Sequence, residues 1–160
     1  MHTRLLGAAA LALALWARPA HAQETRDIAP DALPAAVVGA VNSYLMALQL
    51  PDVNAAAAKA LPVLGGSLLE STGAKLRTPV ERFGLPKDHA HVAEYHVPAR
   101  ITHAQVNGTQ ADGDGAARVE GTWYKLWIGR KDGNTELAAP ITVILQADGS
   151  AKLVTAVGTL

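Results

Sequence analysis

The 160-residue sequence predicts an α+β domain in which N-terminal helices pack on one face of an antiparallel meander sheet. Two observations support this prediction. Apolar residues recur every three or four positions in the first half of the chain, as in amphipathic helices, and every second position from Val92 onward, as in strands. The connections between these strands contain Asn-Gly or Asp-Gly pairs, which favour tight hairpins and hence antiparallel neighbours.

The first 22 residues have the pattern of a cleaved export signal. Arg4 precedes an apolar run over residues 5–16, and an A-x-A cleavage signal at 20–22 stands before Gln23. The run is shorter than the ~20 residues that a membrane span requires. Cysteine is absent from the sequence, so neither a lipid anchor on cysteine nor a disulfide can form. We therefore expect a periplasmic or secreted protein with no segment inserted in the membrane after signal cleavage.

After cleavage the chain has a length typical of one domain, with residues 23–30 as a flexible leader and residues 31–160 as the folded part. The full sequence has 14 basic and 14 acidic residues. Removal of Arg4 and Arg18 with the signal leaves a slight excess of acidic residues and no basic cluster. This balance argues against nucleic acid or an anionic lipid surface as the main partner.

The first helix is predicted from apolar residues spaced three and four apart: Leu33, Val37, Val41, Tyr44, Leu45 and Leu48. Asp31 is placed to be its N-cap, and Pro51 ends it. Asp52 is placed to cap a second helix over residues 53–61, which Pro62 ends.

Residues 62–91 predict a short helix followed by a loop. Four strands are expected beyond it, at about 92–106, 117–129, 136–146 and 151–158. Pro98 has no amide hydrogen for a ladder, so we expect the first strand to be bent, bulged or at an edge there.

The segment VNSYLMALQLPDVNAAAAKAL (41–61) resembles the opening helix pair of the nuclear transport factor 2-like superfamily, which includes ketosteroid isomerases and polyketide cyclases. The shared elements are V-x-x-Y-x-x-A-L and an Asp that starts the second helix. The closing stretch APITVILQADGSAKLVTAVGTL (139–160) is similar to that family's last hairpin. The resemblance implies helices over a curved four-stranded sheet, a cystatin-like cone that encloses a pocket and often forms a homodimer.

In the isomerases of this family, the tyrosine at the position of Tyr44 donates a hydrogen bond to a developing oxyanion. Such a reaction also needs a carboxylate base and a second donor for the oxyanion. Glu70 is the nearest carboxylate to the position implied for the base, slightly out of register, and the strands offer no aspartate as the second donor. Tyr44 therefore has two interpretations: a core residue with a satisfied hydroxyl, or an oxyanion donor with Glu70 as base.

Four histidines fall within residues 87–103: His89, His91, His96 and His103. In an extended chain His89 and His91 share a face, whereas His96 has the opposite parity. His103 would lie roughly 46 Å from His89 at ~3.3 Å per residue. Only the pair of His89 and His91 is placed to chelate a metal, with Asp88 or another segment completing the shell. We expect solvated histidines, no metal site and no other cofactor.

The strand at 117–129 is apolar on both faces. We expect Leu126 and Ile128 to meet the helices, while Trp123 and Trp127, with Lys125 between them, lie at a dimer or partner surface. The alternative is an amphipathic strand with exposed aromatic side chains.

The sequence has no G-x-S-x-G, phosphate-binding glycine loop or H-E-x-x-H motif, so nucleophilic-serine and zinc-hydrolase chemistry have no support. The leading expectation is a non-catalytic, homodimeric domain that binds a small apolar ligand or a protein partner. The residues expected at its binding surface are Tyr44, Leu48, Tyr95, Trp123, Lys125 and Trp127. The alternative is an isomerase- or cyclase-type enzyme that uses Tyr44 as oxyanion donor and Glu70 as base.

Overall fold

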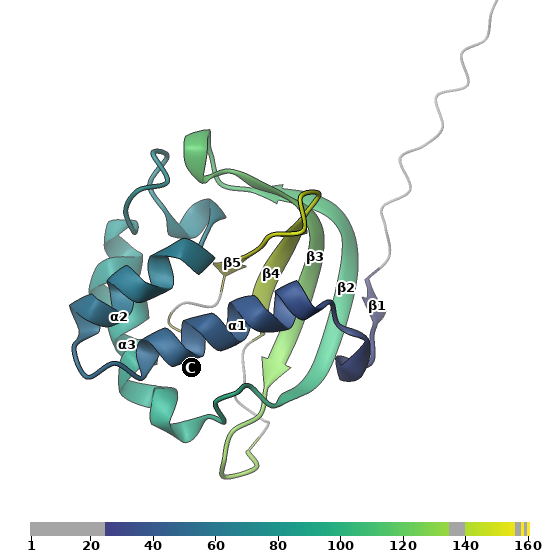
Figure 1. Ribbon diagram of the computed structural model, residues 1–160, viewed down its shortest axis with the longest axis horizontal. Helices are drawn as coiled ribbons and strands as arrows, with labels where there is room; N and C mark the ends of the chain where they lie inside the picture. The colour runs from purple at the N-terminus through teal and green to yellow at the C-terminus, as the bar shows by residue number, and fades with distance from the viewer. Residues whose placement is uncertain (1–24, 135–139, 156–157, 159) are drawn as a thin grey trace, which may run out of the picture.

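The computed structural model describes residues 25–134, 140–155, 158 and 160. The expected export signal at 1–22 lies outside these residues. An α+β fold is confirmed: three α-helices precede a meander of the strands β2 to β5, and a short N-terminal strand, β1, pairs with the free edge of β2 (Figure 1). The sheet therefore has five strands, in the order β1-β2-β3-β4-β5, where four were expected. All neighbouring strands are antiparallel.

The first two helices, α1 (Ala35–Leu48) and α2 (Val53–Ala60), lie close to their predicted positions. Asp52 is the N-cap of α2, where its Oδ2 accepts a hydrogen bond from the amide of Ala55 at 2.7 Å. The expectation that Asp31 caps α1 is wrong. Leu33 precedes a proline and is held in an extended conformation, which separates Asp31 from the helix.

The segment before the sheet is more helical than predicted. Two 3₁₀ turns, Leu61–Val63 and Gly66–Leu68, follow α2. A π-helical turn, Val80–Gly84, leads into α3 (Leu85–His91). A further 3₁₀ turn, Val92–Glu94, follows α3.

The predicted start of the first long strand at 92 is wrong, because β2 begins only at Ile101. Leu85, Asp88 and Val92 are buried at helical spacing, so this part of the chain packs as a helix. Pro98 consequently lies before β2 and not within it.

The strands of the sheet are β1 (Arg26–Asp27), β2 (Ile101–Asp112), β3 (Val119–Ile128), β4 (Ile141–Gln146) and β5 (Ala151–Thr155). β1 falls within the expected leader at 23–30. Parts of the expected third and fourth strands, at 136–139 and 156–157, lie outside the described residues. The register pairs Val106 of β2 with Tyr124 of β3, and Tyr124 with Val143 of β4.

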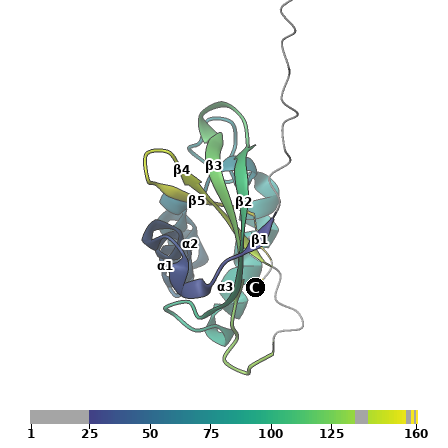
Figure 2. The same ribbon diagram turned by 90° about the vertical axis from the view of Figure 1, so that its right-hand side faces the viewer.

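The main core lies between the helices and one face of the sheet. Helix α1 packs across β4 and β5, and α2 lies on the same side (Figures 1 and 2). The largest fully buried side chains of this core are Tyr44, Leu45, Leu48, Leu64, Leu85, Leu126, Ile141 and Leu153. Figure 2 shows a twisted sheet that is not strongly curled.

The other face of the sheet carries a smaller buried cluster of Val119, Ile144 and Val154, with Trp123 packed against it. Leu126 and Ile128 belong to the helix-side core, as predicted. The strand β3 therefore contributes apolar side chains to both faces.

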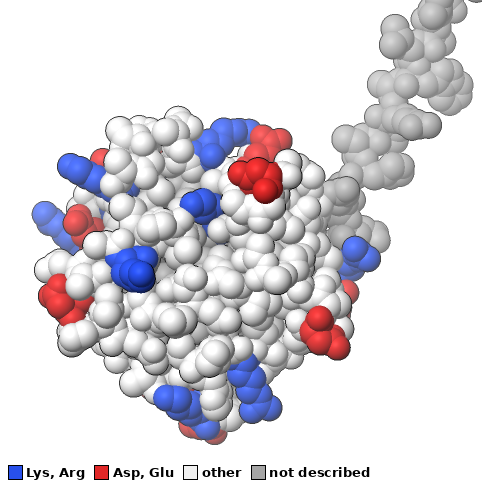
Figure 3. Space-filling model, viewed as in Figure 1, with Lys and Arg blue, Asp and Glu red and all other residues white. Residues whose placement is uncertain are grey.

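The charged side chains on the face shown in Figure 3 are dispersed, and acidic and basic groups alternate around its rim. Among the described residues, no helix combines the length and the hydropathy needed to cross a bilayer.

Candidate functional site

The most deeply buried polar contact joins Tyr44 of α1 to Asp88 of α3. Both residues are fully buried, and the Tyr44 hydroxyl donates a hydrogen bond to Oδ2 of Asp88 at 2.7 Å. Tyr44 is thus a core residue with a satisfied hydroxyl. Sequence reasoning missed Asp88 as its partner, although the helical spacing of Leu85, Asp88 and Val92 was present to be found.

Asp88 also binds the C-terminal end of the described chain. Its Oδ2 accepts from the amide of Gly158 at 2.8 Å, and its Oδ1 accepts from the amide of Leu160 at 3.0 Å. Lys87 Nζ donates to the carbonyl oxygen of Gly158 at 2.7 Å. Among the described residues, three donors reach the Asp88 carboxyl group, an arrangement that suits the ionised form, which only accepts. The amides of residues 158 and 160 and the hydroxyl of Tyr44 therefore engage both carboxylate oxygens of Asp88.

Burial and hydrogen bonding change the pKa of the Asp88 carboxyl group in opposite directions. Burial raises the pKa of its carboxyl group, and the hydrogen bonds from Gly158, Tyr44 and Leu160 partly offset that rise. Burial also raises the pKa of the Tyr44 hydroxyl well above its usual value, and the neighbouring Asp88 carboxylate raises it further. Tyr44 consequently remains a protonated donor at neutral pH.

Glu70, expected as the base beside Tyr44, lies elsewhere. It is exposed and lines a cavity of about 450 Å³ together with Lys75 and Glu81, and Tyr44 does not line this cavity. The structure pairs Tyr44 with Asp88 and does not bring Glu70 to it.

The histidine cluster is dispersed along the chain. His89 and His91 lie in α3, where positions two apart point in different directions. His89 Nε2 contacts the carbonyl oxygen of Leu50 at 2.7 Å, and His91 Nδ1 contacts Glu94 Oε1 at 2.8 Å. Within the part of the chain that the structure describes, no group of three or more potential ligands could hold a metal ion.

Besides Tyr44, two residues expected at a binding surface are core residues. Leu48 is buried in the helix-side core. Tyr95 is 3% exposed, and Arg130 lies over its ring with Cζ 5.7 Å from the centroid. Arg130 also forms ion pairs with Glu94 at 2.6 Å and with Asp132 at 3.0 Å, so this region joins the turn after β3 to the segment after α3.

The other three expected residues share the outer face of β3. Trp123 and Trp127 are partly exposed, and Lys125 between them is exposed. The ring of Trp127 lies against His103 of β2 with centroids 4.7 Å apart, and His103 Nε2 is 3.4 Å from Asp27 Oδ1. Tryptophan and histidine thus form one aromatic surface on this face of the sheet.

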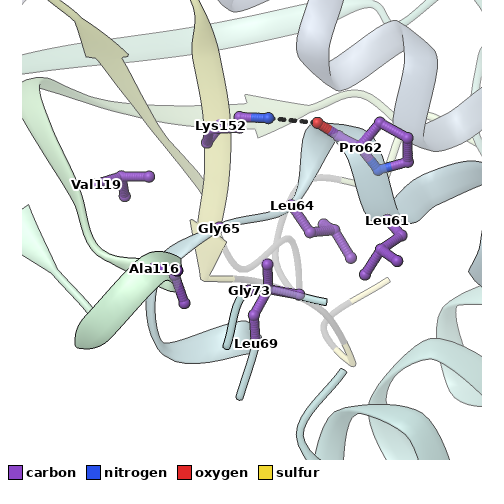
Figure 4. Close-up of a pocket in the computed structure, with 10 residues that line it drawn as sticks. Leu61, Pro62, Leu64, Gly65, Leu69, Gly73, Ala116, Val119 and Lys152 are labelled. Atoms are coloured by element: carbon purple, nitrogen blue, oxygen red, sulfur yellow. Dashed lines mark hydrogen bonds between the residues drawn. The ribbon is translucent and has the colours of Figure 1, made fainter. Parts of the chain in front are cut away.

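A separate apolar pocket of about 310 Å³ lies where the turns after α2 meet the edge of the sheet (Figure 4). We call it the edge pocket. Its lining residues are Leu61, Pro62, Leu64, Gly65, Leu69, Gly73, Ala116, Ala117, Val119 and Lys152. A third cavity, of about 450 Å³, lies over β2, β3 and β4, and its lining includes Thr109, Glu120, Thr122 and Gln146.

The edge pocket is built from the chain crossing beside β5. Leu64 forms an isolated bridge with Leu153, and the amide of Gly65 donates to the carbonyl oxygen of Leu153 at 2.9 Å. Gly65 passes so close to the sheet that a Cβ there would lie 3.0 Å from Val119 and 3.1 Å from Lys152. The glycine therefore allows the crossing chain to form one wall of the pocket. Sequence reasoning did not find this site.

Comparison of the chain with models of protein families, with curated protein sequences and with solved structures gives no match.

Proposed function

We propose that this chain is an exported, non-catalytic binding domain that holds a small apolar ligand in the edge pocket. The observation that supports this proposal best is the lining of the pocket, in which leucine, valine and alanine side chains predominate. Its volume of about 310 Å³ is at the lower end of small-molecule sites. Export is inferred from the signal pattern at residues 1–22.

The burial and the hydrogen bonds of Tyr44 and Asp88 support a binding function over a catalytic one. Both residues are fully buried, and the three hydrogen bonds to Asp88 use both of its carboxylate oxygens. A substrate would have to displace residues 158 and 160 before it could reach either group. Neither residue lines any of the three cavities described above.

We retain the relationship to the nuclear transport factor 2-like superfamily, and its cone-shaped fold, as part of this proposal. The order of the elements supports it, because a helix pair containing Tyr44 precedes a long antiparallel meander. Homodimer formation belongs to the same proposal and is supported by the aromatic surface of Trp123, Trp127 and His103.

A second function is an isomerase- or cyclase-type enzyme with Tyr44 as the oxyanion donor. One observation favours it: the hydroxyl of Tyr44 lies 2.7 Å from a buried carboxyl group whose pKa is raised by burial. This enzyme would use Asp88, which lies beside Tyr44, because Glu70 lines a different cavity and does not reach Tyr44. Residues 158 and 160 would have to move away from Asp88 before a substrate could bind there.

The binding proposal is tested by NMR titration of the folded protein with 1-octanol, a neutral apolar probe. We expect amide shifts concentrated at residues 61–73 and 116–119 and in β5. Ala116 is exposed and lines the edge pocket, so Ala116→Leu should fill the pocket and weaken binding at least about fivefold. Ala58→Leu is the matched control, because Ala58 is also exposed but lines the cavity of Glu70.

Retained binding in Ala116→Leu, with loss in Ala58→Leu, would move the site to the cavity of Glu70 and overturn the proposal. Absence of any octanol-dependent shift in the folded protein would overturn it as well.

A further inference from the structure

The edge pocket has one charged residue in its lining, Lys152 of β5. We infer that its ligand is a monocarboxylate with a short alkyl chain, such as a medium-chain fatty acid. This inference rests on the proposed function and specifies the chemical class of the ligand.

The pocket has a polar end and an apolar end. Lys152 and the carbonyl oxygen of Pro62 lie at one end, and Leu69, Gly73 and Ala116 lie at the other (Figure 4). Leu61 and Leu64 lie on one side between these ends, opposite Val119 (Figure 4). An amphipathic molecule placed along the pocket would put its polar head at Lys152 and its alkyl chain among the leucines.

The ammonium group of Lys152 retains hydrogen-bonding capacity for a ligand. It donates to the carbonyl oxygen of Pro62 at 2.5 Å, which uses one of its three hydrogens. Among the described residues, Lys152 has no carboxylate within ion-pair distance. Asp148 is electrostatically coupled to Lys152, but its Oδ1 already accepts from the amide and hydroxyl of Ser150 at 2.9 and 2.7 Å.

The charge of the site limits the ligand to a single negative charge. One ammonium neutralises one carboxylate, whereas a phosphate or a dicarboxylate would bring a second charge next to an apolar wall. The second charge would have no cationic partner in the lining, so these dianions should bind less tightly than a monocarboxylate. A cationic ligand would be repelled by Lys152, and a neutral ligand would leave the ammonium without a new partner.

The test is calorimetric titration of octanoate and of 1-octanol into the wild-type protein, Lys152→Gln and Lys59→Gln. In Lys152→Gln the new side-chain amide could still donate to the carbonyl oxygen of Pro62, so the pocket wall should persist. Lys59 is exposed on α2 and does not line the pocket, which makes Lys59→Gln the matched control. We expect wild type to bind octanoate about fivefold or more tightly than 1-octanol, the factor expected for a partly exposed ion pair.

In Lys152→Gln this preference should vanish while 1-octanol binding is unchanged, and Lys59→Gln should behave as wild type. If 1-octanol binds but octanoate binds no better, or if Lys152→Gln keeps the preference, the carboxylate inference is wrong and the proposed function stands. If neither probe binds the folded wild-type protein, both are wrong.

Discussion

Asp88 is an unusual core residue, because an ionised carboxylate loses its hydration when it is buried. Three hydrogen bonds replace that hydration here, one from the hydroxyl of Tyr44 and two from the amides of Gly158 and Leu160. The amides come from residues at the far end of the sequence. Asp88 therefore links α1, α3 and the C-terminal end of the described chain through one carboxyl group.

Replacement of Tyr44 by Phe removes one of these donors and leaves the ring in place. We expect the free energy of unfolding to fall by about 1–3 kcal/mol, the cost of a lost hydrogen bond to a buried charged group. The pKa of Asp88 should rise further, because the Tyr44 hydrogen bond lowers it. Urea denaturation measures the first effect, and NMR titration of the Asp88 carboxyl carbon measures the second.

The same variant separates the two proposed functions. Ligand affinity at the edge pocket should change little, because Tyr44 does not line it. In an isomerase, loss of the oxyanion donor would lower turnover of an enolisable ketone by about 10²–10³-fold. Detectable wild-type turnover that falls by such a factor in Tyr44→Phe would contradict the non-catalytic account.

The raised pKa of Asp88 predicts a definite sign for its effect on stability. In the unfolded chain the group titrates near its usual value of 3.8, and in the folded chain it titrates at a higher pH. Between these values the folded state binds more protons, so the stability contributed by Asp88 is fully present below the unfolded pKa. It is lost as the pH rises through the folded pKa.

Asp88→Asn removes this titration and is the reference for measuring it. The difference in unfolding free energy, wild type minus Asp88→Asn, should fall as the pH rises from about 4 toward the folded pKa. The pKa values of Glu94, Asp132 and Asp148 are lowered, which gives the opposite slope, but these groups are present in both proteins. Urea denaturation across this range would contradict the account if the difference stayed flat or increased.

At the level of the elements, two aspartates that occupy similar sequence contexts have different roles. Asp52 caps α2 through the amide of Ala55, whereas Asp31 lies in a turn that precedes α1 and does not cap it. Asp52→Ala should lower the free energy of unfolding by about 1 kcal/mol, and Asp31→Ala should have little effect. Thermal or urea denaturation of both variants checks this, and equal effects would show that Asp52 does not act as a cap.

The helices α1 and α2 were predictable because the apolar spacing and the capping residue in their sequences agree with the way these helices pack. Apolar spacing defines the buried face of α1, and Asp52 defines the start of α2. In α3 the buried face includes Asp88 between Leu85 and Val92, so hydrophobic periodicity alone does not indicate a helix, and the sequence predicts residues 85–91 as a loop before a strand starting at 92. A buried polar residue is recognised only when its partners are known, and those partners lie in α1 and near residue 160.

The edge pocket could not be predicted from the sequence for a related reason. Its walls come from residues 61–73, from 116–119 and from Lys152, which only the fold brings together. No single stretch of these residues has a recognisable motif. The two tryptophans of β3, in contrast, were placed correctly on one face, because alternation along a strand is a local property.

At the scale of the molecule, the outer face of the sheet is the surface that would form a homodimer. It carries Trp123 and Trp127, both partly exposed, and tryptophan is enriched among the residues that contribute most to interface stability. We expect Trp127→Glu to convert the dimer to a monomer with its fold and its octanol binding retained. Analytical ultracentrifugation measures the change.

Phe83→Glu is the control for this experiment. Phe83 is 72% exposed on the π-helical turn before α3, which is not part of the sheet, so the variant should remain a dimer. A monomeric wild type, or a dimer that only Phe83→Glu dissociates, would contradict the proposed interface.

The central claim is that the edge pocket holds a small apolar ligand, and a crystal structure of the protein grown with 8-bromo-1-octanol tests it most directly. The bromine gives an anomalous signal that locates the bound chain without assumptions about its orientation. The account predicts a peak among Leu64, Leu69 and Val119, and no such peak in crystals of Ala116→Leu. A peak confined to another cavity, or an empty edge pocket at saturating probe concentration, would contradict it.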